Sequence, residues 1–445
     1  MKYKSLAALF VCIFAAGSLH AGPRKITIRE CVNIALQNHP NIMMSIEDRK
    51  NAVANYKLVN AKRNILVNGE MKTVEYLKSS SSANEAFNIP GKDTNIGLFA
   101  GLTASYNLYD SKKRQEKDQA RISIDLSKIA SNKIKDDIVL NVKKTYYEYL
   151  IAKENTRLRK QLADKFADKL KLARSLFRNG QRPILDVSKA EMGHAEAMLN
   201  YERAKNKESI KKVELYTSMG IKDLSIDIEP VDIKEMPELK YSAQELFQLS
   251  QIYYPELRRM KLMKKIKKLN ISVQKAARQP SIDMLFSLGY ENKNLQGMSN
   301  VDENFQTRNW NPTFHGALKA YFPVYSGGAI TARIESAVTQ YNKVSYEELQ
   351  VLNQVENLIT AQYRILRELK EQIRMSGLVT SNAEKHLLLA QRSYENGTNT
   401  LLNLQDAEVS VIRAELGHVN ARYDYLMIVS RLANIAGLSE DDICK

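Results

Sequence analysis

The sequence contains little cysteine, which limits the disulfide and metal chemistry open to it. Three cysteines occur in 445 residues, at positions 12, 31 and 444. A disulfide framework or a structural zinc site needs more cysteines at short spacings, so both are excluded. A single bridge between Cys31 and Cys444 remains an alternative in an oxidising compartment, and two unpaired thiols are the simpler interpretation.

The sequence also lacks the motifs of common enzymes. It has no HExxH metal motif, no nucleophile elbow and no Walker A loop. Beyond the N-terminal segment the histidines are scattered, at His39, His194, His315, His386 and His418. We therefore expect no catalytic activity, no bound metal and no cofactor.

After residue 21, no apolar run reaches the length of about 20 residues that a membrane-spanning helix needs. The first 21 residues read MKYKSLAALFVCIFAAGSLHA, with Lys2 and Lys4 before an apolar core and the small Ala21 at the end. This pattern is typical of a cleaved secretory signal, and we expect cleavage after Ala21. The mature chain is therefore predicted to be exported.

Positive charge is in excess, with a formal net charge of +16. Such an excess favours nucleic acid or an anionic surface as a partner, and export argues against nucleic acid. The densest basic run is KLMKKIKKLN at 261–270, where Leu262, Ile266 and Leu269 have helical spacing. We interpret it as the solvated face of an amphipathic helix, with contact to lipid phosphates as the alternative.

Glycine and proline are missing from two long stretches. Residues 111–178 contain neither, and in residues 329–396 Gly377 is the one interruption. Two helices of about 100 Å are therefore predicted, far longer than the average of about 11 or 12 residues. An apolar seam, typical of a coiled coil, follows the first at steps of three or four: Leu158, Leu162, Phe166, Leu170, Ala173 and Phe177.

The chain is internally duplicated. RNGQRPILDVSKAE at 178–191 is echoed by ENGTNTLLNLQDAE at 395–408. Further positions match at nearly the same spacing: Pro40 with Pro255, Gly180 with Gly397, and Gly220 with Gly437. A two-fold duplication is indicated. We expect a first repeat at 22–220, a linker at 221–240, a second repeat at 241–438 and a tail at 439–445.

Apolar and polar residues alternate in four segments, which predicts β-strands at about 65–78, 96–109, 281–291 and 314–325. In the second segment the apolar series is Ile96, Leu98, Ala100, Leu102, Ala104, Tyr106 and Leu108. Such strands with long polar loops between them are typical of a transmembrane β-barrel, although a soluble sandwich gives the same alternation. Known barrels begin at about eight strands, so a barrel would need several chains.

These features occur together with IRECVNIALQNHPNI, YNLYDS, FPVYSGG, the two Asn-Gly turns and the closing MGI and AGL. In this combination the chain resembles the TolC-type outer membrane efflux family over essentially its whole mature length. The resemblance implies a mostly α-helical fold with a small β part. Three chains would contribute four strands each to a 12-stranded transmembrane β-barrel, continued by a long α-helical barrel in the periplasm.

The resemblance also implies a function. The chain would be the outer membrane channel of a tripartite efflux or type I secretion system, a passive exit duct. Its partners would be two further copies of itself, outer membrane lipid, a periplasmic adaptor protein and an inner-membrane transporter. The alternative is a secreted periplasmic coiled-coil scaffold without channel activity.

The resemblance further implies two sets of site residues. Adaptor-contact tips match Asn179, Gly180, Gln181, Asn396, Gly397 and Thr398, although a glycine there is equally a helix cap. The channel constriction matches Asp186, Tyr394, Asn399, Asn403 and Asp406. Asn399 replaces a family arginine and Asn403 a family aspartate, so we expect a gate held by hydrogen bonds more than by ion pairs. Three copies of Asp406 would form an acidic ring that favours cations.

Overall fold

The computed structural model describes residues 24–77, 94–221, 228–230, 236–295, 310–396 and 398–444. The predicted signal peptide, residues 1–21, lies outside this part of the chain. Within it, no helix combines the length and the apolar character needed to cross a membrane.

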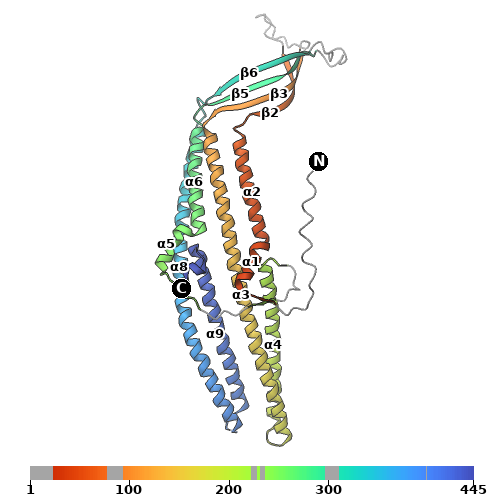
Figure 1. The fold of residues 1–445 in the computed structure, drawn as a ribbon, viewed down its shortest axis with the longest axis vertical. Coiled ribbons are helices and arrows are strands. Elements are labelled where there is room, and N and C mark those ends of the chain that lie inside the picture. The colour runs from red at the N-terminus through yellow and green to blue at the C-terminus, as the bar shows by residue number, and fades with distance from the viewer. Residues whose placement is uncertain are drawn as a thin grey trace. The chain divides into compact units, whose positions relative to one another are not determined.

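Helices make up most of the described chain (Figure 1). The first half contains α1 (Ile28–Asn38), α2 (Pro40–Ala61), α3 (Ser111–Arg178) and α4 (Ile184–Ser218). The second half contains α5 (Ala243–Tyr253), α6 (Pro255–Ala276), α8 (Ala329–Glu395), α9 (Leu401–Ala436) and the short α10 (Glu440–Ile443). The strands are β1 (Arg24–Ile26), β2 (Leu66–Leu77), β3 (Thr94–Asp110), β4 (Ile228–Pro230), β5 (Ser281–Leu295) and β6 (Asn311–Tyr321).

The chain divides into two compact units, and each takes segments from both halves of the sequence. The helical unit comprises the described residues up to Ile46, Ala130–Arg258 and those from Gln350 onward. The sheet unit comprises Glu47–Ile129 and Arg259–Leu349. The compact units therefore do not coincide with the two sequence repeats.

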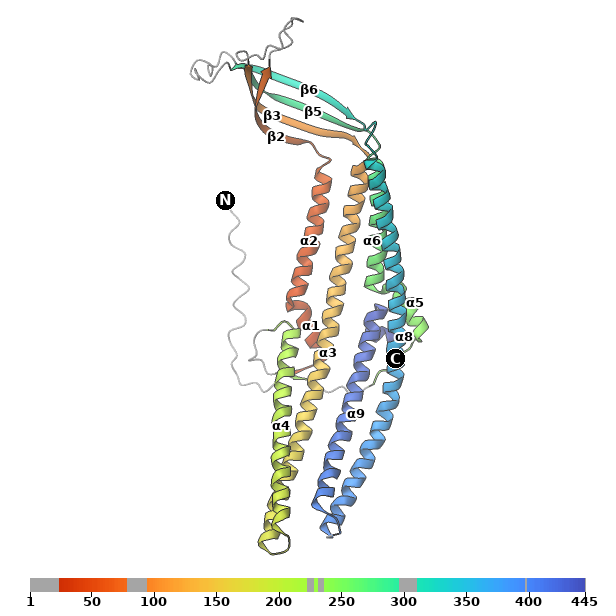
Figure 2. The ribbon, with the colours of Figure 1, turned by 180° about the vertical axis from the view of Figure 1, so that it is seen from behind.

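The sheet unit contains four antiparallel strands in the order β2-β3-β5-β6 (Figure 2). The register places Gly69, Leu102, Leu288 and Phe314 in one row across the sheet. Because side chains of paired residues share a face, one face carries Val67, Met71, Ala100, Leu102, Ala104, Met284, Phe286, Leu288, Tyr290, Phe314 and Leu318. The other carries mostly polar residues, among them Asn68, Glu70, Lys72, Thr103, Ser105, Asn107, Asp283, Ser287, Thr313, His315 and Lys319.

Polar contacts link side chains on the second face. The Asn107 amide donates to an Asp283 carboxylate oxygen at 2.6 Å. The Lys72 ammonium lies 3.6 Å from the Glu70 carboxylate and 5.2 Å from the centre of the Phe99 ring. The sheet is therefore two-sided, with an apolar face and a polar face.

Two details of the strands differ from the expectation. A β-bulge shifts the register between Asn107 and Tyr109 and brings Tyr109 opposite Ile282. Leu108 is thus the extra residue of the bulge and does not continue the apolar series. Strand β6 ends at Tyr321, four residues before the predicted end, since Pro323 has no N–H group to continue the ladder.

The helical unit has two large apolar clusters. In the first, α1 packs on α3 and α4 through Cys31, Val142, Tyr146 and Leu215. In the second, α5, α8, α9 and α10 pack together, and the cluster includes Cys444. Both thiols are buried and unpaired, which agrees with the simpler interpretation of the sequence. Burial raises the pKa of Cys31 to about 12 and that of Cys444 to about 11, which keeps both thiols protonated at neutral pH.

The apolar seam of α3 is confirmed over most of its length. Leu158, Leu162 and Phe166 are buried in one cluster together with Ala197 of α4 and Ile412 of α9. Ala173 is buried in the next cluster toward the turn. The seam ends there, because Phe177 is 41% exposed, and its inclusion in the predicted seam was wrong.

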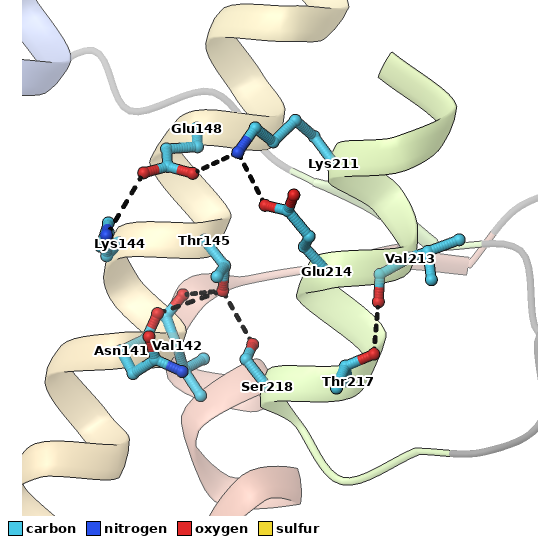
Figure 3. A network of polar contacts seen from close by, with 10 residues as sticks. All are labelled: Asn141, Val142, Lys144, Thr145, Glu148, Lys211, Val213, Glu214, Thr217 and Ser218. Carbon is cyan, nitrogen blue, oxygen red and sulfur yellow. Dashed lines mark hydrogen bonds and ion pairs between the residues drawn. The ribbon is translucent and has the colours of Figure 1, made fainter. Parts of the chain in front are cut away.

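A polar network joins α3 and α4 beside the first cluster (Figure 3). The hydroxyl groups of Thr145 and Ser218, both buried, lie 2.7 Å apart. Glu148 lies one turn beyond Thr145 on α3 and accepts from the Lys211 ammonium at 2.8 Å. The same ammonium donates to Glu214 of α4, its own helix, at 2.7 Å. Every buried hydroxyl in this contact is thus satisfied within the helix pair.

The duplication seen in the sequence is also present in the structure. After α4, Gly220 has a φ of +73°, and a Cβ there would lie 3.0 Å from the Cα of His39, the residue before Pro40. After α9, Gly437 has a φ of +72°, and a Cβ would lie 2.5 Å from the carbonyl carbon of Tyr253, two residues before Pro255. Both halves therefore build the same joint from a return helix and a proline-started helix.

We predict that Gly437→Ala is more destabilising than Gly180→Ala. Both glycines have positive φ, so both substitutions introduce backbone strain. A Cβ at Gly180 meets no atom within 4 Å, whereas one at Gly437 overlaps the Tyr253 backbone. We expect Gly437→Ala to cost about 2 kcal/mol more, seen as a lower thermal unfolding midpoint by circular dichroism. Equal midpoints for the two variants would contradict the close packing of this joint.

Candidate functional site

The candidate site lies in the helical unit, at the turns that close its two helical hairpins. One hairpin pairs α3 with α4 and the other pairs α8 with α9, and Figures 1 and 2 place both turns at the same end of this unit. The site residues predicted from the sequence lie at these turns or within one to two helical turns of them, with Tyr394 in the last turn of α8.

The first turn is a Schellman motif at the end of α3. Gly180, with a φ of +69°, donates its N–H to Phe177 O at 2.9 Å, and Gln181 donates to Leu176 O at 2.9 Å. Gly180 is therefore a helix cap, and the same residue is exposed with open space around it. Its neighbours Asn179 and Gln181 are exposed as well.

The second turn repeats one backbone hydrogen bond of the first, because Thr398 and Ser393 correspond to Gln181 and Leu176, and it adds side-chain contacts. The N–H and the hydroxyl of Thr398 both donate to Ser393 O, at 2.9 and 3.0 Å. Helix α9 then begins with Thr400 as its N-cap, which accepts from the Asn403 N–H, whereas Pro183 at the start of α4 has no side-chain acceptor. Asn396 and Thr398 are exposed, and the predicted tip residue Gly397 lies outside the described residues.

Arg182 connects the two hairpins next to the turns. Its guanidinium carbon lies 5.6 Å from the centre of the Tyr394 ring, and its Nη1 lies 4.0 Å from Asp186 Oδ2. Partial burial raises the pKa of Tyr394, the Asp186 carboxylate raises it further, and the Arg182 charge opposes both. Two predicted constriction residues, Asp186 and Tyr394, are thus brought together by an arginine that the sequence reasoning missed. Its position four residues before Asp186, in the turn that precedes α4, was the available signal.

The two positions that depart from the family pattern contact one another. The Asn403 amide donates to Asn399 Oδ1 at 2.6 Å, and the Thr400 N–H donates to the same oxygen at 2.9 Å. Asp406 is exposed one turn further on, and its carboxylate forms no ion pair with any residue that the structure describes. A neutral hydrogen bond therefore stands where the family has charged groups.

A buried ion pair, which the sequence analysis did not single out, also joins the hairpins. Lys169 of α3 donates to Glu408 of α9, and their side chains are only 13% and 8% exposed. The Lys169 ammonium also lies 5.4 Å from the centre of the Phe166 ring. Burial lowers the pKa of Lys169, and the Glu408 carboxylate opposes that shift. The spacing of three residues between Phe166 and Lys169 puts the lysine on the apolar seam, which was the available signal.

A cavity of about 670 Å³ lies between the two hairpins. Its walls include Lys169, Arg182, Tyr394 and Glu408, so it is lined by the groups that connect the hairpins. Over the described ranges, no cluster of three or more histidine, cysteine or acidic side chains could hold a metal ion. The arrangement is that of a polar junction between helices, with no nucleophile paired with a base.

A sheet with one apolar face, joined to two long helical hairpins with polar tips, defines a membrane-channel subunit. The chain belongs to the outer membrane efflux protein family, whose model matches residues 31–221 and 246–438. The resemblance inferred from the sequence is thereby confirmed. This is a family of transport channels and not of enzymes.

Several known proteins are similar to the chain. The outer membrane protein TolC of Vibrio cholerae is 22% identical over 446 residues, covering 99% of this chain and 97% of the relative. The alkaline protease secretion protein AprF of Pseudomonas aeruginosa is 20% identical over 338 residues, covering 75% and 68%. These matches extend along most of each chain.

Solved structures share the fold. CusC superposes with a TM-score of 0.76 at 17% identity, covering 93% of this chain and 92% of that one. The CmeC outer membrane channel of Campylobacter jejuni gives 0.77 at 15% identity, covering 92% and 85%. The predicted fold, mostly helical with a small antiparallel sheet, is confirmed.

We predict that Lys169→Met alone is strongly destabilising. It would leave the Glu408 carboxylate buried without a counter-charge, at a cost of about 3–5 kcal/mol, whereas the double variant Lys169→Met/Glu408→Leu should regain most of that stability. Lys171→Met is the matched control, because its ion pair with Asp168 is 79% and 77% exposed, and it should cost less than about 0.5 kcal/mol. Thermal unfolding followed by circular dichroism measures all three, and a harmless Lys169→Met would refute the buried pair.

Proposed function

We propose that the chain is the outer membrane channel of a tripartite efflux or type I secretion system, extending into the periplasm. It would act as a passive exit duct, supplied by an inner-membrane transporter through a periplasmic adaptor. The observation that carries this proposal is the two-sided sheet, with its exposed apolar face and its two unpaired edges.

The apolar face of the sheet is not covered by any described part of the chain. Its large side chains are exposed: Val67, Met71, Leu102, Phe286, Leu288, Tyr290, Phe314 and Leu318. Exposed apolar patches of this kind mark membrane or protein contacts. With polar residues alternating on the other face, the pattern fits a barrel wall that faces lipid on one side and a water-filled lumen on the other.

The edges of the sheet support a trimer. Among the strands that the structure describes, β2 and β6 each pair on one side only, and in lipid their free backbone groups must find partners. If β6 of one copy pairs with β2 of the next, three copies close a 12-stranded barrel without a free edge. Four strands alone are below the smallest known barrels, of about eight.

The turns would form the periplasmic end of the channel. We propose the exposed residues Asn179, Gly180, Gln181, Asn396 and Thr398, with Gly397, as the adaptor contacts. Asp186, Tyr394, Asn399, Asn403 and Asp406 would line the constriction, joined by Arg182. The gate would combine the Asn399–Asn403 hydrogen bond with the Arg182–Asp186 ion pair.

The chain would be organised as two family repeats, 22–220 and 241–438, with a linker at 221–240. The segment 439–445, expected as a tail, contains the capped helix α10, whose Ile443 is buried. The alternative of a secreted scaffold receives no support from the relatives, and a soluble scaffold would leave the apolar sheet face in water.

We predict that Leu288→Lys prevents assembly and Ser287→Lys does not. The two residues are adjacent at the middle of β5, so they lie at the same depth but on opposite faces. A lysine facing lipid near the bilayer midplane costs about 2–4 kcal/mol, and one facing the lumen does not. Native mass of detergent extracts from outer membranes should show trimers for the wild type and Ser287→Lys and little protein for Leu288→Lys. A wild-type protein that is monomeric and soluble without detergent would contradict the channel proposal.

We predict that Arg182→Ala raises single-channel conductance severalfold in planar bilayers, because it releases Asp186 and Tyr394 at the constriction. Arg178→Ala is the control. Arg178 is the exposed last residue of α3, and no partner for it occurs among the described residues. Equal increases for both variants would indicate a general effect of charge and count against Arg182 as a gate residue.

A further inference from the structure

The four helices that adjoin the sheet meet it at one end. Asp110 at the end of β3 pairs with Ser281 at the start of β5, and Ser281 pairs with Tyr321 at the end of β6. Strand β2 begins at Leu66, opposite Ser105 of β3. Figure 2 shows α2, α3, α6 and α8 reaching the strands at this end. The last turns of α2 and α6 and the first turns of α3 and α8 therefore lie at one level of the sheet unit.

Basic side chains occur at all four of these junctions. Five of them are exposed and have no ion-pair partner in the described part of the chain, and we name them the basic collar: Lys62, Arg63, Arg114, Lys275 and Arg333. Two further cations at this level are held by hydrogen bonds. Lys113 Nζ donates to Lys62 O at 2.6 Å, and Arg278 Nη2 donates to Thr331 Oγ1 at 3.2 Å.

Acidic residues at the same level do not neutralise the collar. Asp110 accepts from the Lys112 N–H at 2.9 Å, and Asp283 accepts from the Asn107 amide. Glu116 and Glu335 stand in the next positions of α3 and α8. Neither forms an ion pair with a collar residue.

A polar groove of about 520 Å³ runs between α6 and α8 beside the collar. Amide side chains line it at Asn270, Gln274 and Gln340, and Arg333 is the only charged residue in its wall. At its edge, Lys267 Nζ donates to Gln340 Oε1 at 2.9 Å. One guanidinium surrounded by amide donors is suited to a phosphate group.

The order of side chains along the sheet unit matches the order of layers in a membrane. The strands carry the exposed apolar face, the segment after β6 carries the exposed Phe322 and Tyr325, the latter 89% exposed, and the collar follows. Aromatic residues favour the boundary between hydrocarbon and headgroups. Lysine and arginine side chains extend from there toward headgroup phosphates.

We propose that the basic collar binds phospholipid headgroup phosphates in the periplasmic leaflet of the outer membrane, with preference for anionic phospholipids. This inference rests on the proposed barrel, and it assigns a partner to part of the net charge of +16. It also favours, at the sheet end of α6, the lipid-contact interpretation of the basic helix over a purely solvated face.

The test uses the full-length trimer in detergent and native mass spectrometry with added phosphatidylglycerol or phosphatidylethanolamine. The collar variant carries Lys62→Gln, Arg63→Gln, Lys275→Gln and Arg333→Gln. The control removes the same charges from exposed positions of the helical unit by Arg178→Gln, Arg203→Gln, Lys205→Gln and Lys207→Gln. We expect the wild type and the control to bind phosphatidylglycerol preferentially and the collar variant to bind it at least tenfold more weakly.

Three results would overturn the inference. One is undiminished phosphatidylglycerol binding by trimers of the collar variant. Another is displacement of the lipid by an equal concentration of inorganic phosphate, which would indicate a site for free anions. The third is a collar variant whose lipid preference is unchanged but whose channel has an altered ion selectivity, which would indicate that the collar faces the lumen. If the collar variant does not assemble, the single variant Arg333→Gln should still weaken phosphatidylglycerol binding severalfold. Failure of the proposed channel would give a different result, the absence of wild-type trimers.

Discussion

The backbone hydrogen bonds that β2 and β6 leave unmade at the edges of the sheet are the constraint on which the rest of the structure depends. A four-stranded sheet with free edges and an exposed apolar face is not a stable end state in water. Lipid can cover the face, but it cannot satisfy the edge N–H and C=O groups, so further strands must do so. In the proposed channel, oligomer, membrane and lumen would follow from one requirement, because closing the sheet would satisfy the edges, turn the apolar face outward and enclose the polar face.

The long helices are the other consequence of this arrangement. Helices α3 and α8 have narrow apolar seams and solvent-exposed polar faces. Each is therefore stabilised mainly by packing against its neighbours and not by its own helix propensity. Toward the turns polar links join the apolar contacts. Phe177 is exposed, and beside the small buried cluster that contains Val187 and Leu401 lie the Arg182 bridge and the Asn399–Asn403 hydrogen bond. Polar links at the tip can exchange partners with water at little cost, whereas the buried Lys169–Glu408 pair cannot. The buried ion pair is therefore a firmer link between the hairpins than the polar links beside the turns.

Much of this could be predicted from the sequence where a local rule applies. The absence of glycine and proline over 111–178 predicted the bounds of α3, and period-two alternation predicted the strands and the apolar face. The failures lie where geometry is not local. The bulge at Leu108 depends on how β3 pairs with β5, and the partners of Arg182 and Lys169 come from the other half of the chain. Periodicity records which face of a helix is buried, but it does not record which helix buries it.

Charge is distributed unevenly between the two units. Helix α6 carries eight lysine and arginine residues against one glutamate, and Lys264 and Lys267 on it are tied to Glu348 and Gln340 of α8. The turns, in contrast, present amides, the carboxylates of Asp186 and Asp406, and the guanidinium groups of Arg178 and Arg182. Cations therefore dominate α6 in the sheet unit, whereas neutral, acidic and basic groups occur together in the tips of the helical unit. A net charge of +16 is consequently compatible with the proposed cation-favouring constriction, because what an ion would meet there is set by a few side chains within about 8 Å and not by the sum over the chain.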